Sequence, residues 1–433
     1  MKLSALEIAH KIKGAGGRAL LVGGCVRDGL LGLEAKDIDL EVFGLVCEDV
    51  LKLFPGADTV GKSFGVIKLG NVDVAFPRRE TKLGQGHKAF AIASDPHLTL
   101  AEAAARRDFT VNAIYQDPLT GEYLDPYGGI ADLRAKVLKN VSGHFAEDPL
   151  RVLRGMQFIA RFELEPAKEL VEICRRMTPE GLPRERLFDE WQKLLLQGRK
   201  ISRGLEFLRA TGWVKYYPEL AKCIGCEQDP AWHPEGDVWN HTLECLDRME
   251  KGDIVVALAV LCHDFGKPYC TKFDPEAGRI RSLGHDVLGV KHTLDFLKRL
   301  TREERLLKEV PPLVQFHMAP YSYYRSRAGD SAVRRLSARV VRLDRLLKVA
   351  AADNTPPEAI AWLKGAAERL DIAQNAPKPI VLGRHLLALG MAPGPSMGQD
   401  LKALYEAQLD GRFFNLENGL ELWYNMHSSS KKS

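Results

Sequence analysis

The stretch LLVGGCVRDGLLGLEAKDIDLEVF, residues 20–43, decides the fold of the first part of the chain. The apolar run from Ala19 to Val22 predicts a buried strand that stops at Gly23 and Gly24. Residues 36–42 then alternate between acidic and apolar side chains, which is typical of a strand with one buried face. The sequence therefore predicts two strands separated by a helical turn that follows the glycine pair.

The outer face of the second strand carries two carboxylates, Asp37 and Asp39, side by side. Adjacent carboxylates repel each other unless a cation lies between them, and Mg²⁺ binds carboxylates together with phosphate oxygens. Gly23 and Gly24 let a ligand approach the backbone closely, and Arg27 can pair with a phosphate. These features predict a metal–nucleotide site, and an edge strand with a charged outer face is the alternative.

A third carboxylate is expected from the next hairpin. Residues 66–69 and 72–76 predict two strands joined by a tight turn at Gly70 and Asn71. Asp73 stands between two valines, so its side chain leaves the core face, and we predict that it joins the metal site. The alternative is a charged hairpin residue without a ligand.

The string GGCVRDGLLGLEAKDIDLEV, residues 23–42, closely resembles the signature of the class II tRNA nucleotidyltransferases and bacterial poly(A) polymerases. The resemblance implies an α+β fold with a small mixed-sheet head, related to that of DNA polymerase β, followed by helical domains. It also implies that Asp37 and Asp39, assisted by Asp73, hold two Mg²⁺ ions, while the glycine pair and Arg27 hold the triphosphate. We expect a head at 1–140, a nucleotide-selecting neck at 141–220, an HD domain at 221–375, and a helical segment with a disordered tail at 376–433.

The segment RRDFTVNA, residues 106–113, matches the second motif of this family. The resemblance implies that Arg107 contacts the nucleotide and that Asp108 meets the ribose, whose 2′-hydroxyl distinguishes ribonucleotides from deoxyribonucleotides. Without the resemblance, these residues read as charges on a helix surface.

The segment EDPLRVLR, residues 147–154, predicts a helix start, with Asp148 as N-cap and Pro149 as first helical residue. Arg151 and Arg154 follow on one face, and a capped surface helix explains these residues as well as a binding site does. In the resembled family this motif presents hydrogen-bonding groups to the incoming base. Asp148 would accept from an exocyclic amine and Arg151, held by Glu147, would donate to ring acceptors, so C and A would be selected without a template.

Two neighbouring segments complete this reading of the first half. Residues 77–95 lack an apolar period and predict a polar loop, which helps to switch nucleotide choice in the resembled family. The helix that begins near Arg184 resembles the ERxxxE element of the family, with Glu185, Arg186 and Glu190 in the matching places. The resemblance implies that this element buttresses the nucleotide-binding helix.

A second constellation lies beyond residue 220. His263 and Asp264 end an apolar helix, where both are costly to bury unless they bind something. With His241 upstream and Asp353 downstream, they form a ligand set suited to a divalent transition metal. The order resembles the HD phosphohydrolases, which implies phosphoester hydrolysis by a metal-activated water. His285 and His317 are candidates for second-metal or phosphate ligands.

Two other patterns stay open between structural and functional readings. Cys223 and Cys226 form a lone CxxC, with His233 as the only nearby candidate for a further zinc ligand. Arg335, Arg339 and Arg342 are spaced for one helical face, which suits either solvent or RNA phosphates.

Composition sets the broad class. The 433 residues are 45% hydrophobic and 27% charged, with a net charge of +4, which permits an RNA partner without requiring one. No apolar run approaches the ~20 residues that span a bilayer, and the N-terminus lacks the features of a signal peptide. We expect a cytoplasmic enzyme with reduced cysteines and no membrane partner.

The function predicted from these residues is addition of CMP and AMP, from CTP and ATP, to the 3′ end of tRNA, with an HD-type hydrolytic activity in addition. Enzymes that add only C-C or only A share every motif quoted, as does the head of a poly(A) polymerase. A phosphohydrolase with a non-catalytic RNA-binding head is the alternative from another class. The sequence leaves the oligomeric state open.

Overall fold

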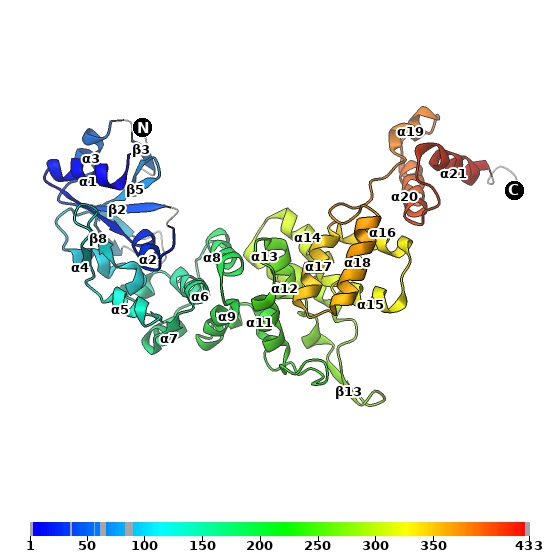
Figure 1. Cartoon of the computed structure of the whole chain (residues 1–433), viewed down its shortest axis with the longest axis horizontal. Helices are drawn as coiled ribbons and strands as arrows, with labels where there is room; N and C mark the ends of the chain where they lie inside the picture. The colour runs from blue at the N-terminus through cyan, green and yellow to red at the C-terminus, as the bar shows by residue number, and fades with distance from the viewer. Residues whose placement is uncertain (1–2, 35–36, 56, 61–65, 83–89, 429–433) are drawn as a thin grey trace. The chain divides into compact units, whose positions relative to one another are not determined.

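The computed structural model describes residues 3–34, 37–55, 57–60, 66–82 and 90–428, which form two compact units, residues 1–216 and 217–433 (Figure 1). The first unit contains the sheet and the helices that follow it, whereas the second is almost entirely helical. The finer division into head, neck, HD domain and tail stays a prediction. No helix in the described part of the chain is long and apolar enough to cross a membrane.

A seven-stranded mixed sheet organises the first unit, as expected for an α+β head. Strands β2 and β5 run parallel, and the other neighbouring pairs run antiparallel. The strands in spatial order are β3 (Asp58–Val60), β4 (Val66–Leu69), β5 (Val72–Ala75), β2 (Ile38–Phe43), β1 (Arg18–Val22), β8 (Tyr115–Gln116) and β9 (Tyr123–Leu124).

One face of the sheet packs against α1 (Ala5–Gly14) and α3 (Cys47–Leu53). Ile8 and Ile12 of α1 are fully buried against the apolar side of β2, whose Leu40 and Val42 are also inaccessible to solvent. The alternation in β2 therefore buries its apolar residues on this face, as the sequence predicts, and turns its acidic residues to the other.

The opposite face carries α2 (Gly24–Leu30), α4 (Leu100–Ala105) and the 3₁₀ turn η1 (Thr110–Asn112). Leu20, Val22 and Tyr115 form a small core on this side. Leu20 pairs with Glu41 in the antiparallel register, so the acidic residues of β2 emerge beside this core. The candidate active site lies on this face.

The prediction of a strandless loop over residues 77–95 is wrong at both ends of that segment. Strands β6 (Arg78–Lys82) and β7 (Phe90–Ser94) pair antiparallel in a sheet of their own, and residues 83–89 lie outside the described part. These strands are identified by the hydrogen-bonded register of their backbones. Their sequences lack a regular alternation of apolar side chains, which is why the sequence did not predict them.

Helices then follow the sheet. They are α5 (Gly129–Arg134), α6 (Leu150–Phe162), α7 (Lys168–Arg175), α8 (Arg184–Gln197) and α9 (Ile201–Ala210), with the short parallel pair β10 (Val137–Leu138) and β11 (Glu165–Pro166). Helix α6 packs between α8 and α9, and a Cβ on Gly204 would lie 2.6 Å from the carbonyl oxygen of Met156. Gly204 therefore allows α6 and α9 to approach closely.

In the second unit, α12 (Ile254–Cys262) is apolar on all sides, and all of its residues except Ile254 are buried. The other helices of this part of the unit are α10 (Pro218–Ala221), α11 (Val238–Arg248), α13 (His285–Leu300), α14 (Glu304–Gln315), α15 (Ala319–Ser326), α16 (Asp330–Val340), α17 (Leu343–Ala352) and α18 (Pro357–Arg369). In the sequence between α12 and α13, β12 (Lys272–Asp274) and β13 (Arg279–Arg281) form a small antiparallel hairpin. The C-terminal helices α19 (Gly383–Ala388), α20 (Pro395–Leu409) and α21 (Leu416–Ser428) share a separate core.

The arginine-rich segment of the second unit is not one helical face. Val341, with φ of 64°, separates α16 from α17, so Arg339 and Arg342 belong to different elements. Arg335 pairs with Asp410 and Glu406, and Arg342 pairs with Asp344. These ion pairs favour a structural role for Arg335 and Arg342 over binding of RNA phosphates.

Candidate active site

Three acidic side chains of the head lie on the sheet face opposite α1 and α3. Asp39 on β2 stands directly beside Asp73 on β5 in the parallel register, and Asp37 immediately precedes β2. Lys68 on the neighbouring strand approaches Asp73, with Nζ 3.2 Å from Oδ1. Among the described residues, the three carboxylates do not form a set of oxygens within 4.8 Å of one another. The structure thus places the predicted carboxylates together on one face at a wider spacing than direct metal contact requires.

The electrostatics of Asp39 fit a cation site. Burial raises the pKa of Asp39 above its ordinary value, Arg107 lowers it, and the negative charges of Asp73 and Asp37 add to the rise. A cation bound beside Asp39 would therefore offset the effects of burial and of the neighbouring carboxylates. Carboxylate oxygens are also the donors that Mg²⁺ takes from proteins, so these residues fit that ion.

A buried network that the sequence reading missed anchors Arg107. Glu41 follows Asp39 on the same strand face, and its Oε2 accepts hydrogen bonds from Arg107 Nη2 and from the Tyr115 hydroxyl, each at 2.9 Å. Burial opposes the charge on Arg107, but Glu41 and Tyr115 raise its pKa above the ordinary value. The alternation that revealed Asp37 and Asp39 already placed Glu41 on this face.

Gly23 borders the same charges. Its φ is 76°, and a Cβ there would lie 3.4 Å from Arg107 Nη1 and 4.0 Å from Asp39 Oδ2. Gly24 begins α2 directly after it. The predicted glycine pair therefore leaves open space between a guanidinium and a carboxylate, where a side chain would otherwise stand.

If the head binds CTP and ATP as the resemblance of its motifs implies, Glu41→Gln is expected to raise the KM for both nucleotides by about tenfold, with a smaller change in kcat, because Arg107 loses its anchoring charge. Steady-state kinetics on a tRNA primer measure the split between the two constants. Tyr115→Phe removes only the neutral hydrogen bond and serves as the milder matched variant. An unchanged KM in Glu41→Gln would show that the network does not position Arg107 for the nucleotide.

Arg27 lies inside the molecule. Its Nε and Nη2 donate to Asp28 Oδ1 at 2.9 and 2.6 Å, and its Nη1 donates to Asn112 Oδ1 at 2.6 Å. Its guanidinium also lies over the rings of Phe158 and Phe162, 4.8 and 4.5 Å from their centroids. In this structure Arg27 ties α2 to η1 and α6, and its role as a triphosphate ligand stays a prediction.

Asp108 and Arg154 form a partly buried ion pair between the second motif and α6, in which only Asp108 is enclosed. Arg154 Nε donates to Asp108 Oδ2 at 2.7 Å, while Asn112 and the Phe109 amide donate to Oδ1 at 2.9 and 2.8 Å. Burial alone would raise the pKa of Asp108, but Arg154 and these hydrogen bonds bring it below the ordinary value. Asp108 is therefore a fixed anion that orients Arg154.

Asp148 and Arg151 stand at the start of α6. The prediction of Asp148 as N-cap is wrong by one residue, because α6 begins at Leu150 and Pro149 is its N-cap. Asp148 Oδ1 still accepts from the Leu150 amide, at 3.0 Å. Arg151 donates to two backbone carbonyls, those of His144 at 2.7 Å and Arg106 at 2.6 Å.

The partner of Glu147 differs from the expectation. Instead of holding Arg151, Glu147 Oε2 accepts from Arg106 Nη2 at 2.9 Å, and its Oε1 lies 2.9 Å from His144 Nδ1. Glu147 therefore supports Arg151 indirectly, since Arg151 binds the backbone carbonyls of the same two partners.

Helix α8 contacts α6 through the residues that the ERxxxE resemblance singled out. Arg186 Nη2 donates to Asp148 Oδ2 at 3.2 Å, and Glu190 Oε1 lies 4.0 Å from Arg154 Nη1. Glu190 is 2% exposed, and its Oε2 has no hydrogen-bond partner in the described part of the chain. The buttressing contacts expected for Arg186 and Glu190 are present.

The second constellation converges in the second unit. His241 Nε2 lies 3.2 Å from His263 Nε2 and 2.9 Å from Asp353 Oδ1, and His263 Nε2 lies 3.2 Å from Asp264 Oδ2. All four predicted ligands are thus within reach of one another, although they come from α11, the end of α12 and the end of α17.

Two further histidines complete the cluster. His285 Nε2 lies 3.3 Å from His317 Nε2 and 3.4 Å from Asp264 Oδ1. The structure therefore separates two ligand groups, one containing His241, His263 and Asp353 with Cys245, and the other containing Asp264, His285 and His317. The sequence reading named both histidines as candidate second-metal ligands.

Hydrogen bonds set the orientation of these imidazoles. Nδ1 of His263, His285 and His317 lies 2.7–2.8 Å from the backbone carbonyls of Val260, Ser282 and Val314, and Nδ1 of His241 lies 2.5 Å from Glu235. A ring that donates from Nδ1 directs the Nε2 lone pair into the cluster, as metal-binding histidines do. Burial lowers the pKa of His317 to about 4, which keeps that ring neutral.

Asp264 is buried among these rings. It is 1% exposed, and neither carboxylate oxygen has a well-aligned hydrogen bond, although Lys267 Nζ lies 2.7 Å from Oδ2. Burial alone would raise the pKa of Asp264, but His263 and Lys267 hold it well below the ordinary value. A buried carboxylate surrounded by imidazole rings is a ligand set that suits a divalent transition metal.

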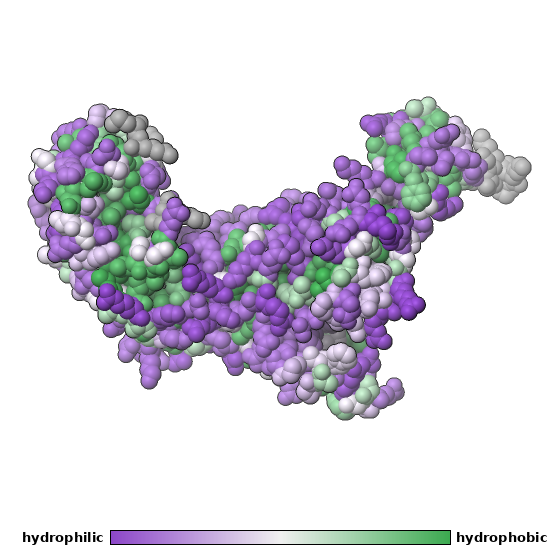
Figure 2. Space-filling model, in the orientation of Figure 1, coloured by the Kyte–Doolittle hydropathy of each residue, from purple (hydrophilic) through white to green (hydrophobic). Residues whose placement is uncertain are grey.

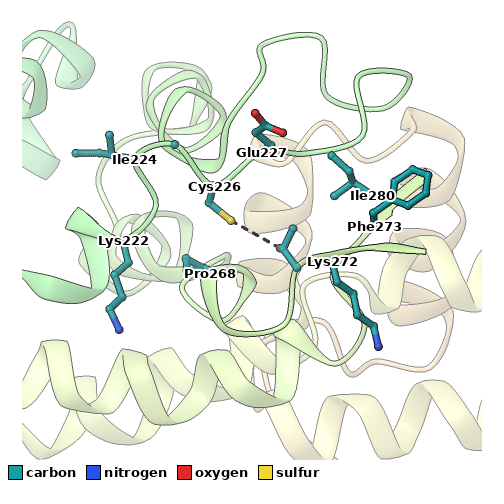
Figure 3. Close-up of a pocket in the computed structure, with 10 residues that line it drawn as sticks. Lys222, Ile224, Cys226, Glu227, Pro268, Lys272, Phe273 and Ile280 are labelled. Atoms are coloured by element: carbon teal, nitrogen blue, oxygen red, sulfur yellow. Dashed lines mark hydrogen bonds between the residues drawn. The ribbon is translucent and has the colours of Figure 1, made fainter. Parts of the chain in front are cut away.

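The CxxC pair does not join a metal-binding group of the described residues. Cys226 Sγ faces Thr271 Oγ1 at 3.7 Å in the cavity drawn in Figure 3, and Cys223 Sγ lies 3.4 Å from the Glu219 carbonyl oxygen. All eight cysteines are free, and burial raises the pKa of Cys223 well above its ordinary value. These contacts give no support to a zinc site at this pair.

Two protein-family models match this chain, one within the first unit and one that extends a few residues beyond it. Residues 19–139 match the poly A polymerase head domain, and residues 163–224 match the probable RNA and SrmB-binding site of polymerase A. The first match contains the acidic strand, and the second contains α8.

Curated relatives extend the similarity beyond the head. The multifunctional CCA protein of Methylobacillus flagellatus is 39% identical over 310 residues, which cover 69% of this chain and 73% of that protein. The protein of the same name from Neisseria gonorrhoeae is 37% identical over 305 residues, covering 68% and 72%.

Solved structures share the fold. The Bacillus stearothermophilus CCA-adding enzyme in complex with CTP aligns with a TM-score of 0.70 at 23% identity, covering 99% of this chain and 98% of that one. The Thermotoga maritima CCA-adding enzyme complexed with tRNA aligns with a TM-score of 0.59 at 20% identity, covering 97% and 94%.

Proposed function

The chain belongs to the multifunctional CCA protein family, and we propose that it adds CMP and AMP, from CTP and ATP, to the 3′ end of tRNA. The observation that carries this proposal is the pairing of Asp39 with Asp73 beside Arg107 and Gly23, inside a matched polymerase head. This arrangement offers carboxylates for a metal and open backbone for a triphosphate.

Asp37 and Asp39, with Asp73, would hold Mg²⁺ in the head. When bound, the ions supply charge that activates the primer hydroxyl and neutralises the pyrophosphate leaving group. Arg107 adds a fixed positive charge beside Asp39. Gly23 and Gly24 admit the triphosphate, and Arg27 secures the helix that follows them.

Base selection belongs to the start of α6. Asp148 presents a carboxylate that accepts from the exocyclic amine of cytosine or adenine, and Arg151 and Arg154 supply donors for ring acceptors. Uracil and guanine place carbonyl oxygens where the amine is needed, so they meet the carboxylate unfavourably. Arg186 and Asp108 support this choice, because they fix Asp148 and Arg154 through hydrogen bonds.

Asp148→Ala is expected to reduce incorporation of both C and A by about 5- to 150-fold and to weaken the rejection of U and G, because one charged acceptor is lost. Single-nucleotide incorporation with each of the four nucleoside triphosphates measures the change. Asp189→Ala on α8 is a matched acidic control from the same region. Unchanged selectivity in Asp148→Ala would remove this residue from base recognition.

The activity is tested with two tRNA transcripts, one that lacks its terminal C-C-A and one that ends in C-C. Each is incubated with Mg²⁺, CTP and ATP, and the extended 3′ end is then sequenced. We expect C-C-A on most molecules. Arrest after C-C, addition of one A only to a transcript ending in C-C, or long A tails would instead identify a CC-adding, an A-adding or a poly(A)-adding enzyme.

We propose a second, hydrolytic site at the cluster around Asp264. A bound divalent transition metal would supply an activated water and polarise a phosphoryl group. His241, His263, Asp264 and Asp353 would hold it, and the convergence of imidazole Nε2 atoms on a buried carboxylate supports this assignment. Lys267, at the edge of the cluster, places a positive charge where a phosphoester would approach. We place both activities in the cytoplasm, where tRNA and nucleoside triphosphates meet.

A further inference from the structure

A cavity of about 490 Å³ lies in the second unit where the end of α15 packs against α18. The residues that line it are Tyr324, Arg325, Arg327, Ala328 and Trp362. Its volume falls within the range of about 300–1,000 Å³ that is typical of small-molecule sites. None of these five residues is acidic, and none belongs to the metal-binding groups of the described residues. The cavity is therefore separate from both of the catalytic sites proposed above.

Two aromatic side chains form one wall of this cavity. The ring centroids of Tyr324 on α15 and Trp362 on α18 lie 6.4 Å apart, with their planes inclined at 59°. Tyr324 is 36% exposed, and Trp362 is half-buried, so both rings are held by the helices and still reach solvent. Nucleic-acid bases stack on rings that are presented in this way.

The remaining polar side chains of the cavity supply positive charge. Arg325 and Arg327 are exposed, and neither forms an ion pair with a residue that the structure describes, whereas Arg335 and Arg342 do. Arg325 lies over the ring of Tyr321, with Cζ 5.9 Å from the centroid, which orients the guanidinium without neutralising it. In Figure 2 the surface around α15 and α18 is largely hydrophilic, with paler side chains among it. Two uncompensated guanidinium groups beside one cavity suit a phosphate.

The backbone at Arg327 indicates that its side chain matters. Arg327 ends α15 with φ of 52°, and its amide donates to the Tyr324 carbonyl at 3.2 Å. Glycine is the usual residue at such a helix end, because a side chain is disfavoured at positive φ. Residues held in this conformation cluster at functional sites. The chain thus keeps a guanidinium at the cavity in a position where glycine fits the backbone more easily.

We propose that this cavity binds a nucleotide, with Tyr324 and Trp362 against the base and Arg325 and Arg327 at its phosphate. A nucleotide uses both halves of the cavity, whereas a free base or a simple phosphate uses only one. Stacking accepts every base, so the site distinguishes nucleotides from other anions without choosing among bases. The ligand is an unpaired residue of an RNA strand or a free mononucleotide. Neither nucleotide addition nor hydrolysis at the sites proposed above requires this cavity.

The test measures binding to the full-length protein, with a short labelled oligoadenylate followed by fluorescence anisotropy and AMP followed by titration calorimetry. We expect Trp362→Ala to weaken binding by about 5- to 150-fold, because one stacking ring is lost. Trp362→Phe keeps a ring and should preserve most of the affinity. Tyr324→Ala removes an exposed ring and should weaken binding in the same direction, which gives a second measurement where loss of the half-buried tryptophan prevents folding.

Arg327→Gly separates the role of the guanidinium from that of the backbone. Glycine adopts the positive φ readily, so Tm should stay unchanged or rise. Affinity for oligoadenylate should fall, and the slope of its logarithm against the logarithm of salt concentration should decrease by about one, because one phosphate contact is lost. Arg302→Gln, which removes an exposed arginine just before α14, is the matched control and should leave the affinity unchanged.

Unchanged affinity for both oligoadenylate and AMP in the folded ring variants or in Arg327→Gly would overturn the inference. Oligoadenylate binding that depends on Trp362 identifies an RNA strand as the ligand. AMP binding that depends on Trp362, together with unaltered oligoadenylate binding, identifies a free mononucleotide. No nucleoside triphosphate or metal ion is added, so the result does not depend on catalysis by the head or by the Asp264 cluster.

Discussion

Asp39→Ala is expected to abolish nucleotide addition to tRNA, with a fall in kcat of about 10³-fold or more, while the protein stays folded. Asp39 is the carboxylate that the sheet places directly beside Asp73 and next to the guanidinium of Arg107. Removing it takes away a metal ligand at the centre of the acidic face, and neither neighbour occupies its position on β2. Rapid-quench incorporation of AMP into a tRNA ending in C-C measures the loss.

The same substitution should leave thermal stability unchanged or slightly raised in the absence of Mg²⁺. The pKa of Asp39 is raised in the folded protein, so its ionised form is less favourable there than in the unfolded chain at neutral pH. Neutralising the side chain removes that penalty. Asp49→Ala on α3 is the matched control and should retain full activity, because its carboxylate forms an exposed ion pair with Lys52. Full incorporation by Asp39→Ala would contradict the metal assignment.

Asp264→Ala is expected to abolish the transition-metal binding and the phosphohydrolase activity proposed for this site, and to leave nucleotide addition intact. Metal content after dialysis and hydrolysis of a nucleotide phosphoester measure the first two effects, and primer extension measures the third. The two sites occupy separate compact units, and the carboxylates of each are carried by different elements. Parallel loss of both activities in a folded variant would contradict this independence.

In contrast to Asp39→Ala, Asp264→Ala should lower the thermal stability of the protein. Asp264 carries the charge that faces His263 and Lys267, and its own pKa is held well below the ordinary value. Its removal leaves a buried ammonium group without its ion-pair partner, which costs about 3–5 kcal/mol. A clear fall in Tm for Asp264→Ala, against none for Asp39→Ala, is therefore the expected contrast. His317→Ala, which removes a neutral ring from the ligand group that also contains Asp264, should lower Tm less and still reduce metal binding.

Patterns local in sequence predicted much of the head. Alternation in residues 36–42 gave the acidic strand, and the turn at Gly70 and Asn71 joins β4 to β5 as expected. The α+β fold and the family followed from motifs in the same stretch, and the family comparison confirms both. Such patterns succeed because each involves residues that share one element.

Contacts between distant elements were not accessible in this way. The Arg27 side chain is buried because it donates a hydrogen bond to Asn112 and packs over two aromatic rings of α6. All of these partners are distant from Arg27 in the sequence. Glu147 binds Arg106 instead of Arg151, since the second motif and α6 meet only after folding. The two partnerships depend on packing, which a single sequence does not display.

The second unit shows both outcomes. His285 and His317 could be named as ligands because histidines beside a His-Asp pair suggest a metal site, and they do join the cluster. The helix expected to carry Arg335, Arg339 and Arg342 on one face is interrupted at Val341, which has a positive φ. Valine rarely adopts a positive φ, so the sequence does not predict a break at this residue.

The most direct test of the account offers each nucleoside triphosphate alone, with Mg²⁺, to three tRNA transcripts that end before C-C-A, after the first C, and after C-C. The account predicts C on the first two, A on the third, and negligible incorporation of U or G throughout. Comparable incorporation of U or G would contradict selection of C and A by the side chains at the start of α6. Addition of A irrespective of the primer end would contradict the ordered addition of C-C-A.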